Sequence, residues 1–283
     1  MPRAAVNGTD LAYKVEGTGR PLVFLPGMGG TSRMFGPQTE AFRPTHRVIR
    51  PDPRGTGRSG TLTGPAGTVL NTHCDDLAAL LDHLRIGRVV AVGVSYGGAV
   101  ALRFGLRHPD RVAGLVVSDT YAELSPANPT EAVVLLGSYL TLPLCYLPRS
   151  WLGLMGRRFY ARWPAAVDAI PPLLEEFRPT EAILEGLAMC RAGRNRDLAG
   201  LDVPVLGIVG DFTRAGVRIM RRLTDAIPGA RLEVVRDSFD PSNLCQPGEF
   251  NRLLAGFLRQ IDSWEWAEKS MGDDGLKSSV SFA

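Results

Sequence analysis

The residue best suited to chemistry in this sequence is a serine set between glycines. Residues 88–100 read RVVAVGVSYGGAV and place Ser95 in a Gly-x-Ser-x-Gly pattern. A Val-rich run typical of a buried strand precedes it, and an Ala-rich helical pattern follows. A sharp strand-to-helix turn of this kind lifts the seryl oxygen above a sheet, and the glycines leave room for the crowded backbone. We therefore expect Ser95 to be an active-site nucleophile.

A nucleophilic serine needs a group that accepts its proton, and the chain is unusual in this respect. Imidazole suits the task because its pKa of about 6.5 lies near working pH. Near the C-terminus, however, the chain reads SFDPSNLCQP, which contains the acid Asp240 and no histidine. Among the four histidines, only His73 lies just before a helical pattern whose start can face the serine. A structural role at the start of that helix is the simpler interpretation of His73.

The elements that must position these residues alternate between strands and helices. Asn7-Gly8 predicts an opening β-hairpin. The strand-like runs that follow are Pro21–Leu25, Arg47–Arg50, Arg88–Val92, Val112–Val117, Val203–Val209 and Arg231–Val235. The helical patterns between them are Thr31–Phe42, Asn71–Leu84, Gly98–Arg107, Ala215–Ile227 and Glu249–Ile261. Such alternation predicts an α/β fold, with a parallel sheet covered by helices on both faces.

One interval interrupts this alternation and suggests a helical lid. Residues 121–199 contain apolar helical segments, aromatic clusters and several prolines, but no clear strand. We expect residues 1–120 and 200–262 to form the core and residues 121–199 the lid. The polar, small-residue-rich segment 263–283 is expected to be disordered.

Composition narrows the function classes. The chain has 283 residues, is 45% hydrophobic and has a net charge of +3 that is spread along the sequence, so we expect no nucleic-acid partner. Without a signal-peptide pattern or a membrane-spanning run, we expect a cytoplasmic protein with no membrane partner. The four widely spaced cysteines predict neither a zinc site nor a disulfide framework. A Gly-x-Gly-x-x-Gly loop is absent, so we expect no cofactor and no metal, and the oligomeric state stays open.

Several motifs, taken in order, resemble the α/β-hydrolase superfamily. LPGMGG at residues 25–30, PDPRGTGRS at 51–59 and HPDRVAGLVVSDT at 108–120 are similar to passages of that family, as is the Gly-x-Ser-x-Gly turn. The resemblance spans residues 12–258 and implies a mostly parallel eight-stranded sheet flanked by helices, with an inserted lid. It also implies an oxyanion hole formed by the backbone amides of Met28 and Tyr96.

The family's two other catalytic positions differ in this chain. In the segment VLGIVGDFTRAG, the resemblance assigns the catalytic acid to Asp211, displaced toward the preceding glycine. Asp119, which follows an earlier strand, is the alternative acid in the family. Counting back from Pro247 puts Asp240 where the family has its histidine. The resemblance therefore implies a degenerate triad.

Three functions are compatible with this set of residues. An ordinary carboxylate with a pKa of about 4 is a weak base for a serine, so the leading prediction is non-hydrolytic chemistry. In it, Asp240 transfers protons in a lyase, cyclase or isomerase, and Ser95 helps to polarise a carbonyl. The second is a serine esterase, thioesterase or lactonase with a rearranged triad of Ser95, Asp211 and either Asp240 or His73. The third is a non-catalytic ligand-binding protein.

The aromatic and apolar content of the predicted lid indicates a hydrophobic small molecule as the substrate. Trp151, Phe159 and Trp163 are the expected substrate-binding residues. A polyketide-like or terpenoid intermediate that carries a ketone, ester or lactone would match this prediction.

Overall fold

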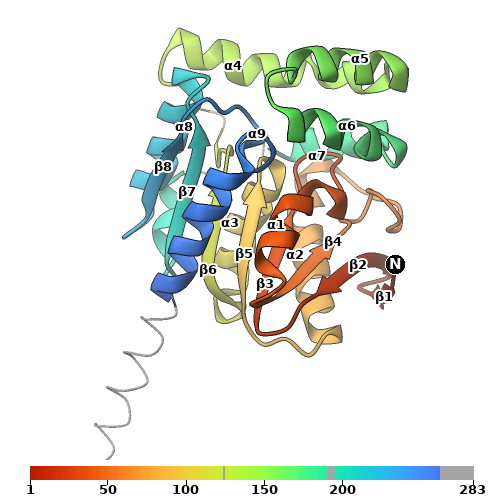
Figure 1. Ribbon diagram of the computed structural model, residues 1–283, viewed down its shortest axis with the longest axis vertical. Helices are drawn as coiled ribbons and strands as arrows, with labels where there is room; N and C mark the ends of the chain where they lie inside the picture. Colours follow the sequence, from red (N-terminus) through yellow and green to blue (C-terminus); the bar gives the residue numbers. More distant parts are fainter. Residues whose placement is uncertain (124, 190–194, 262–283) are drawn as a thin grey trace, which may run out of the picture.

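The computed structural model describes residues 1–123, 125–189 and 195–261 (Figure 1). Its central element is an eight-stranded sheet in the order β1-β2-β4-β3-β5-β6-β7-β8. The pairs β1–β2 and β2–β4 are antiparallel, and the remaining pairs are parallel. The strands are β1 (Arg3–Val6), β2 (Thr9–Glu16), β3 (Arg20–Leu25), β4 (His46–Pro51), β5 (Val89–Val94), β6 (Val112–Ser118), β7 (Val205–Gly210) and β8 (Arg231–Val235). This confirms the predicted fold class.

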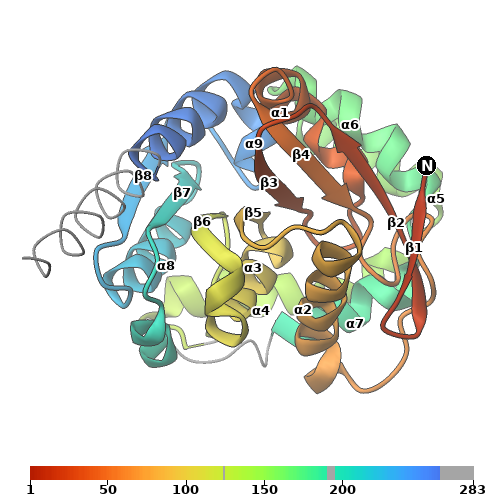
Figure 2. The same ribbon diagram turned by 90° about the horizontal axis from the view of Figure 1, so that it is seen from below.

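Helices cover both faces of the sheet, as Figure 2 shows from below. One face carries α2 (Ala66–His83), α3 (Tyr96–Arg107) and α8 (Arg214–Asp225). The other carries α1 (Gly36–Phe42), α9 (Ser242–Cys245) and a helix over residues 247–261. Short 3-10 turns complete the core: η1 (Ser32–Phe35), η2 (Pro109–Arg111) and η4 (Asn195–Gly200). Strand β5 is buried at every position, as a central parallel strand covered on both faces must be.

Two hydrophobic cores lie on opposite faces of the sheet. One joins α2, α3 and α8 to the sheet through residues such as Leu77, Phe104 and Leu223. The other joins α1 and the helix over residues 247–261 through residues such as Phe42 and Phe250. Side chains alternate between the faces of a strand, so Val89 and Ala91 enter the first core while Val90 and Val92 enter the second.

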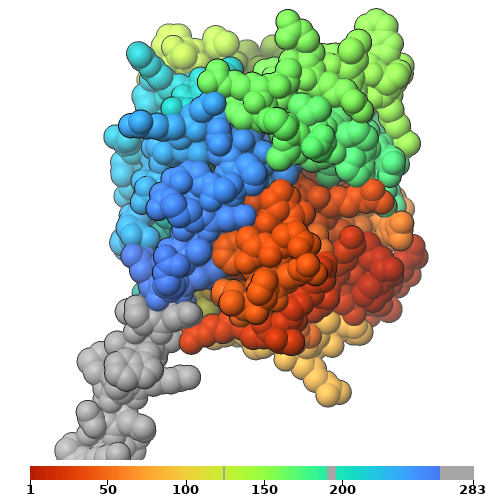
Figure 3. Space-filling view, in the orientation of Figure 1, coloured from red at the N-terminus to blue at the C-terminus, as the bar shows by residue number. Residues whose placement is uncertain are grey.

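The chain between β6 and β7 forms a helical insertion that lies above the sheet (Figure 1). It contains α4 (Pro129–Leu140), η3 (Leu142–Tyr146), α5 (Arg149–Phe159), α6 (Pro164–Glu175) and α7 (Pro179–Met189). In the space-filling view the insertion covers the upper end of the core (Figure 3). The domain boundaries, and the role of this insertion as a lid, stay predictions. The expected disorder of residues 263–283 lies outside the described residues.

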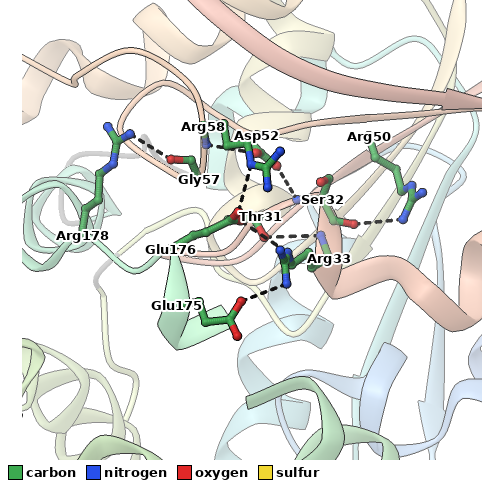
Figure 4. Close-up of polar contacts among 10 residues, drawn as sticks. All are labelled: Thr31, Ser32, Arg33, Arg50, Asp52, Gly57, Arg58, Glu175, Glu176 and Arg178. Atoms are coloured by element: carbon green, nitrogen blue, oxygen red, sulfur yellow. Dashed lines mark hydrogen bonds and ion pairs between the residues drawn. The ribbon is translucent and has the colours of Figure 1, made fainter. Parts of the chain in front are cut away.

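Charged side chains tie the insertion to two core loops (Figure 4). Glu176 pairs with Arg33 at 3.5 Å and with Arg58 at 3.4 Å. Arg178 donates a hydrogen bond of 2.9 Å to the carbonyl oxygen of Gly57. Exposed pairs of this kind contribute about 0–1 kcal/mol each, so they orient the insertion more than they stabilise it.

None of the helices in the described parts of the chain combines the length and the apolar character needed to cross a bilayer.

Candidate active site

The turn at Ser95 has the geometry predicted for a nucleophile elbow. Ser95 stands between the end of β5 and the start of α3, with φ 52° and ψ −118°. A Cβ atom on Gly93 would overlap the carbonyl oxygen of Gly97, and one on Gly97 would overlap the carbonyl oxygen of Leu25. Only glycine fits at these two positions. The positive φ of a non-glycine residue stores backbone strain that the surrounding packing must hold.

The side chain of Ser95 lies against the carboxyl group of Asp240, close enough for its hydroxyl to lower the pKa of that group. Asp240 lies in the loop between β8 and α9, and the helical insertion holds this loop in place. The hydroxyl of Tyr160 donates to the backbone carbonyl of Asp240 at 2.6 Å, and Nε1 of Trp163 donates to the carbonyl of Asp237 at 2.8 Å. The position that the resemblance assigns to histidine therefore puts a carboxyl group against the serine.

A second buried carboxyl group, that of Asp119, faces Asp240 from the end of β6. Asp119 has a φ of 50°, a left-handed conformation that aspartate tolerates better than most residues. Its oxygens accept four hydrogen bonds, which come from the amides of Gly210 (3.1 Å) and Ser242 (2.7 Å) and from the hydroxyls of Ser242 (2.9 Å) and Ser118 (2.8 Å). These donors fix the orientation of the Asp119 carboxylate.

The environments of the two carboxyl groups differ, so their acidities differ. Burial raises the pKa of Asp119, but the hydrogen bonds from Ser242, Gly210 and Ser118 oppose that shift. Burial raises the pKa of Asp240 well above its usual value, the charge of Asp119 raises it further, and only the Ser95 hydroxyl opposes the shift. Two close carboxyl groups cannot both ionise freely. The pKa of Asp240 is therefore raised more strongly than that of Asp119, and Asp119 is the more readily ionised of the two.

The structure brings neither Asp211 nor His73 to the serine. Asp211 is exposed after β7, where its backbone amide donates to the carbonyl of Val235 at 3.0 Å. The two ring nitrogens of His73 contact the Tyr96 hydroxyl at 2.8 Å and the Arg54 carbonyl at 3.0 Å. Burial lowers the pKa of His73 to about 4, so its ring is neutral. Its environment is that of a structural core histidine, and Asp119 takes the place beside Asp240.

The loop after β3 passes directly beside Ser95, as an oxyanion hole requires. A Cβ atom on Gly27 would lie 3.5 Å from the Cβ atom of Ser95. The amide of Tyr96 belongs to the first turn of α3, where amides have no acceptor within the helix. Met28 follows Gly27, so its amide and that of Tyr96 stay the predicted oxyanion donors.

Sequence analysis missed Glu185, a buried carboxyl group on α7 that contacts the same loop. The amide of Gly29 donates to Oε2 of Glu185 at 2.7 Å, while Oε1 has no hydrogen-bond partner among the described residues. Burial raises the pKa of Glu185 to about 8, so it is neutral at neutral pH. A glutamate within an apolar helical pattern carries no sequence signal that distinguishes it from a surface residue.

A cavity of about 410 Å³ opens beside the two aspartates. Helices α4 and α8 supply apolar walls that include Val134, Leu135, Ile219 and Met220. Among the described residues that line it, Asp119 and Asp240 are the only ones with an ionisable carboxyl group, and none is an arginine or a lysine. The described part of the chain contains no cluster of histidine, cysteine and carboxylate side chains suited to a metal ion.

The three aromatic residues predicted to bind substrate are not among the residues that line this cavity. Trp151 is 63% exposed on α5, and Trp163 is buried against the loop that carries Asp237. Phe159 is half-exposed and packs on Phe239, which does line the cavity, with ring centroids 5.1 Å apart. The apolar wall comes instead from α4 and α8, which lie far apart in the sequence.

Comparison with known proteins identifies the family of this chain. Residues 20–141 match the family model described as alpha/beta hydrolase fold. The protein named "Putative carbamate hydrolase RutD" from Azorhizobium caulinodans is 30% identical over 270 residues, which cover 93% of this chain and 100% of the relative. This chain belongs to the α/β-hydrolase superfamily.

Two further relatives of this α/β-hydrolase are also named for hydrolytic reactions. The protein named "3-oxoadipate enol-lactonase 2" from Acinetobacter baylyi is 26% identical, with 85% of this chain and 89% of the relative covered. The crystal structure of the enol-lactonase from Burkholderia xenovorans is 26% identical with a TM-score of 0.77, and covers 91% of this chain and 100% of the other.

These relatives correct the leading functional prediction. Because proteins that match this α/β-hydrolase over nearly its whole length are named as hydrolases, the prediction of lyase, cyclase or isomerase chemistry is wrong. That prediction gave decisive weight to the missing imidazole. It placed Asp240 at the serine but assigned the acid to Asp211, and it did not foresee the four hydrogen bonds that fix the carboxylate of Asp119. The findings favour the hydrolase alternative.

Proposed function

We propose that this protein is a serine hydrolase that cleaves the carbonyl–oxygen bond of a small neutral ester or lactone. The observation that carries the proposal is the contact of the Ser95 hydroxyl with Asp240, whose carboxyl group faces the fixed carboxylate of Asp119. Serine, proton acceptor and oriented acid thus follow the order of a triad, with aspartate at its centre. The relatives named as a lactonase and a carbamate hydrolase support acyl chemistry.

In the proposed reaction Ser95 attacks the substrate carbonyl and its proton moves to the ionised form of Asp240. The amides of Met28 and Tyr96 stabilise the developing oxyanion. Asp240 then returns the proton to the leaving oxygen, and water cleaves the acyl-enzyme by the same steps. Asp240 can take up the Ser95 proton only in its ionised form, and burial and the charge of Asp119 raise the pKa of that group. The rate of hydrolysis is therefore expected to rise with pH.

The walls of the cavity support a neutral substrate. Its lining is largely apolar, and the charge it contains is the negative charge shared by Asp119 and Asp240. An anionic substrate would lose its hydration there without gaining a cationic partner. Esters with short or medium alkyl groups are therefore expected to bind better than esters of the same size that carry a carboxylate.

The proposal is tested by hydrolysis of p-nitrophenyl butyrate together with labelling by a fluorophosphonate. We expect Ser95→Ala to abolish both reactions, while Ser150→Ala, at an exposed serine on α5, changes neither. Asp240→Asn is expected to lower kcat by a factor of about 10² or more, in the range of a general base. If the unsubstituted protein neither hydrolyses esters nor takes up the label between pH 7 and 10, the proposal fails.

A matched pair of variants separates the two candidate acids. Asp119→Asn removes the carboxylate that faces Asp240, whereas Asp211→Asn alters an exposed carboxylate after β7. We expect the first variant to lose most of its activity and the second to keep it. The opposite result would return the acid to Asp211.

A further inference from the structure

The outer surface of the helical insertion carries most of the exposed large hydrophobic side chains in the described chain. Val133, Leu140 and Leu154 are 71%, 70% and 69% exposed. Ten of the fifteen exposed large hydrophobic residues lie between positions 133 and 159, on α4, η3 and α5. They are Val133, Val134, Leu136, Leu140, Leu144, Tyr146, Trp151, Leu154, Met155 and Phe159. A concentration of this kind marks an interaction surface, because single exposed hydrophobic residues are normally scattered.

The spacing of these residues gives both helices an apolar outer side. On α4 the exposed positions 133, 136 and 140 recur at helical spacing, and on α5 positions 151, 154 and 155 do the same. The opposite side of α5 packs on α6, where Gly156 lies against Ile170. Figure 1 shows α4 and α5 together in the uppermost layer of the molecule. We refer to the outer side of α4, η3 and α5 as the insertion face.

The charge of the insertion face has one sign. Residues 132–167 contain four arginines, Arg149, Arg157, Arg158 and Arg162, and no aspartate, glutamate or lysine. Arg162 pairs with Asp237, and Arg149 bonds to the carbonyl of Phe177. Arg157 and Arg158 are exposed and form no ion pair among the described residues. A second copy of the chain, placed symmetrically on this face, would bring like charges together, so the charge favours an anionic partner.

A groove of about 520 Å³ between α5 and α6 is lined by both arginines and apolar side chains. Its lining includes Arg149, Arg157, Leu154 and Leu174, so guanidinium groups and apolar side chains border one space. Glu175 also lines it, and its charge is paired with Arg33 at 3.2 Å. Such a lining suits an anionic headgroup attached to an alkyl chain.

From these observations we infer that the insertion face binds the surface of an anionic lipid layer. Apolar side chains flanked by arginines and exposed aromatic rings are typical of helices that lie in the interface of a bilayer. The prediction of no membrane partner rested on the absence of a spanning segment, which does not bear on a helix that lies on the surface. Val134 lines the cavity at Asp240 and so lies on the inner side of α4, outside the insertion face. The binding is independent of the proposed catalysis.

Sedimentation with lipid vesicles tests the inference. We expect the protein to pellet with vesicles of phosphatidylcholine and phosphatidylglycerol at 7:3, less with phosphatidylcholine alone, and less as salt rises. Leu140→Gln combined with Leu154→Gln should weaken binding by about tenfold or more, because two exposed apolar contacts are lost. Arg157→Glu with Arg158→Glu should remove the preference for the anionic lipid. A charge control, Arg3→Glu with Arg231→Glu on β1 and β8, should leave binding unchanged.

Three outcomes would overturn the inference. The first is that the parent protein stays in the supernatant with every vesicle composition. The second is that the leucine variant pellets as the parent does. The third is that analytical ultracentrifugation shows the leucine variant to be a monomer where the parent is a dimer, which would assign the face to a second copy. Thermal unfolding confirms that each variant is folded. Ser95→Ala is expected to bind vesicles as the parent does, so a failure of the proposed hydrolysis leaves this test intact.

Discussion

Replacing Asp240 with histidine is the most direct test of how this site is built. The structure already supplies the strained elbow at Ser95, the loop beside it and a carboxylate at Asp119 held by four hydrogen bonds. What the site lacks is an imidazole beside the serine. Asp240 lines a cavity of about 410 Å³, so an imidazole at this position has room. In Asp240→His, Asp119 would orient the ring and the ring would accept the Ser95 proton.

The expected gain in rate for Asp240→His follows from the loss of rate that the absence of a triad base causes. Loss of a triad member typically lowers the rate by a factor of about 10⁴ or more. The native Asp240 replaces part of that function in its ionised form, so we expect Asp240→His to raise kcat/KM for p-nitrophenyl butyrate at pH 7 by about 10³. This corresponds to about 4 kcal/mol of transition-state stabilisation. The rate should also become independent of pH above about 7.5, since a histidine of ordinary pKa is then neutral.

Initial rates between pH 5 and 10 measure this effect, and three variants control it. Asp240→Asn has the size of aspartate without its basicity and should show no gain. Ser95→Ala combined with Asp240→His should be inactive. Asp119→Asn combined with Asp240→His should lose most of the gain, because the ring is no longer oriented. If a folded Asp240→His protein is no faster than the parent, the assignment of positions 119 and 240 to a triad is refuted.

Further predictions concern the three buried groups around the site. Asp119→Asn, made as a single substitution, should shift the rise of activity toward lower pH and reduce the maximal activity, since the negative charge that raises the pKa of Asp240 is gone. An unchanged pH profile would contradict an effect of Asp119 on the pKa of Asp240. Glu185 has a folded-state pKa of about 8 against about 4.5 unfolded, so its contribution to stability is full below pH 4.5 and falls as pH rises to 8. At pH 9 Glu185→Gln should therefore be more stable than the parent by up to a few kcal/mol, and it should unfold at a higher temperature. Equal melting temperatures at pH 9 would count against a neutral buried carboxyl group at position 185. The pKa of His73 is lowered to about 4 in the fold, so the stability of the protein falls as the pH drops from about 6.5 toward 4. In calorimetry, His73→Asn should lose less stability over this pH range than the parent does. An equal loss would exclude His73 as the source of the decline.

Local patterns in the sequence determined the fold and the position of the serine. The elbow at Ser95 is a short-range structure, because strand β5, the turn and helix α3 are contiguous and the glycines at 93 and 97 are required by local crowding. Alternating apolar runs predicted the order of strands and helices for the same reason. Helix boundaries follow less directly from such patterns: α2 begins at Ala66 and not at Asn71, where its apolar pattern is first clear.

Only the tertiary structure decided which groups meet at the serine. Asp119, Asp240 and the loop at Gly27 come from distant parts of the chain, and Asp119 was chosen over Asp211 by the four donors that converge on it from β6, β7 and α9. The burial that raises the pKa of Asp240 is likewise a property of packing, because desolvation depends on which neighbours exclude water. The sequence could name the residues able to do chemistry, whereas their distances and acidities arise from long-range contacts that one-dimensional spacing does not encode.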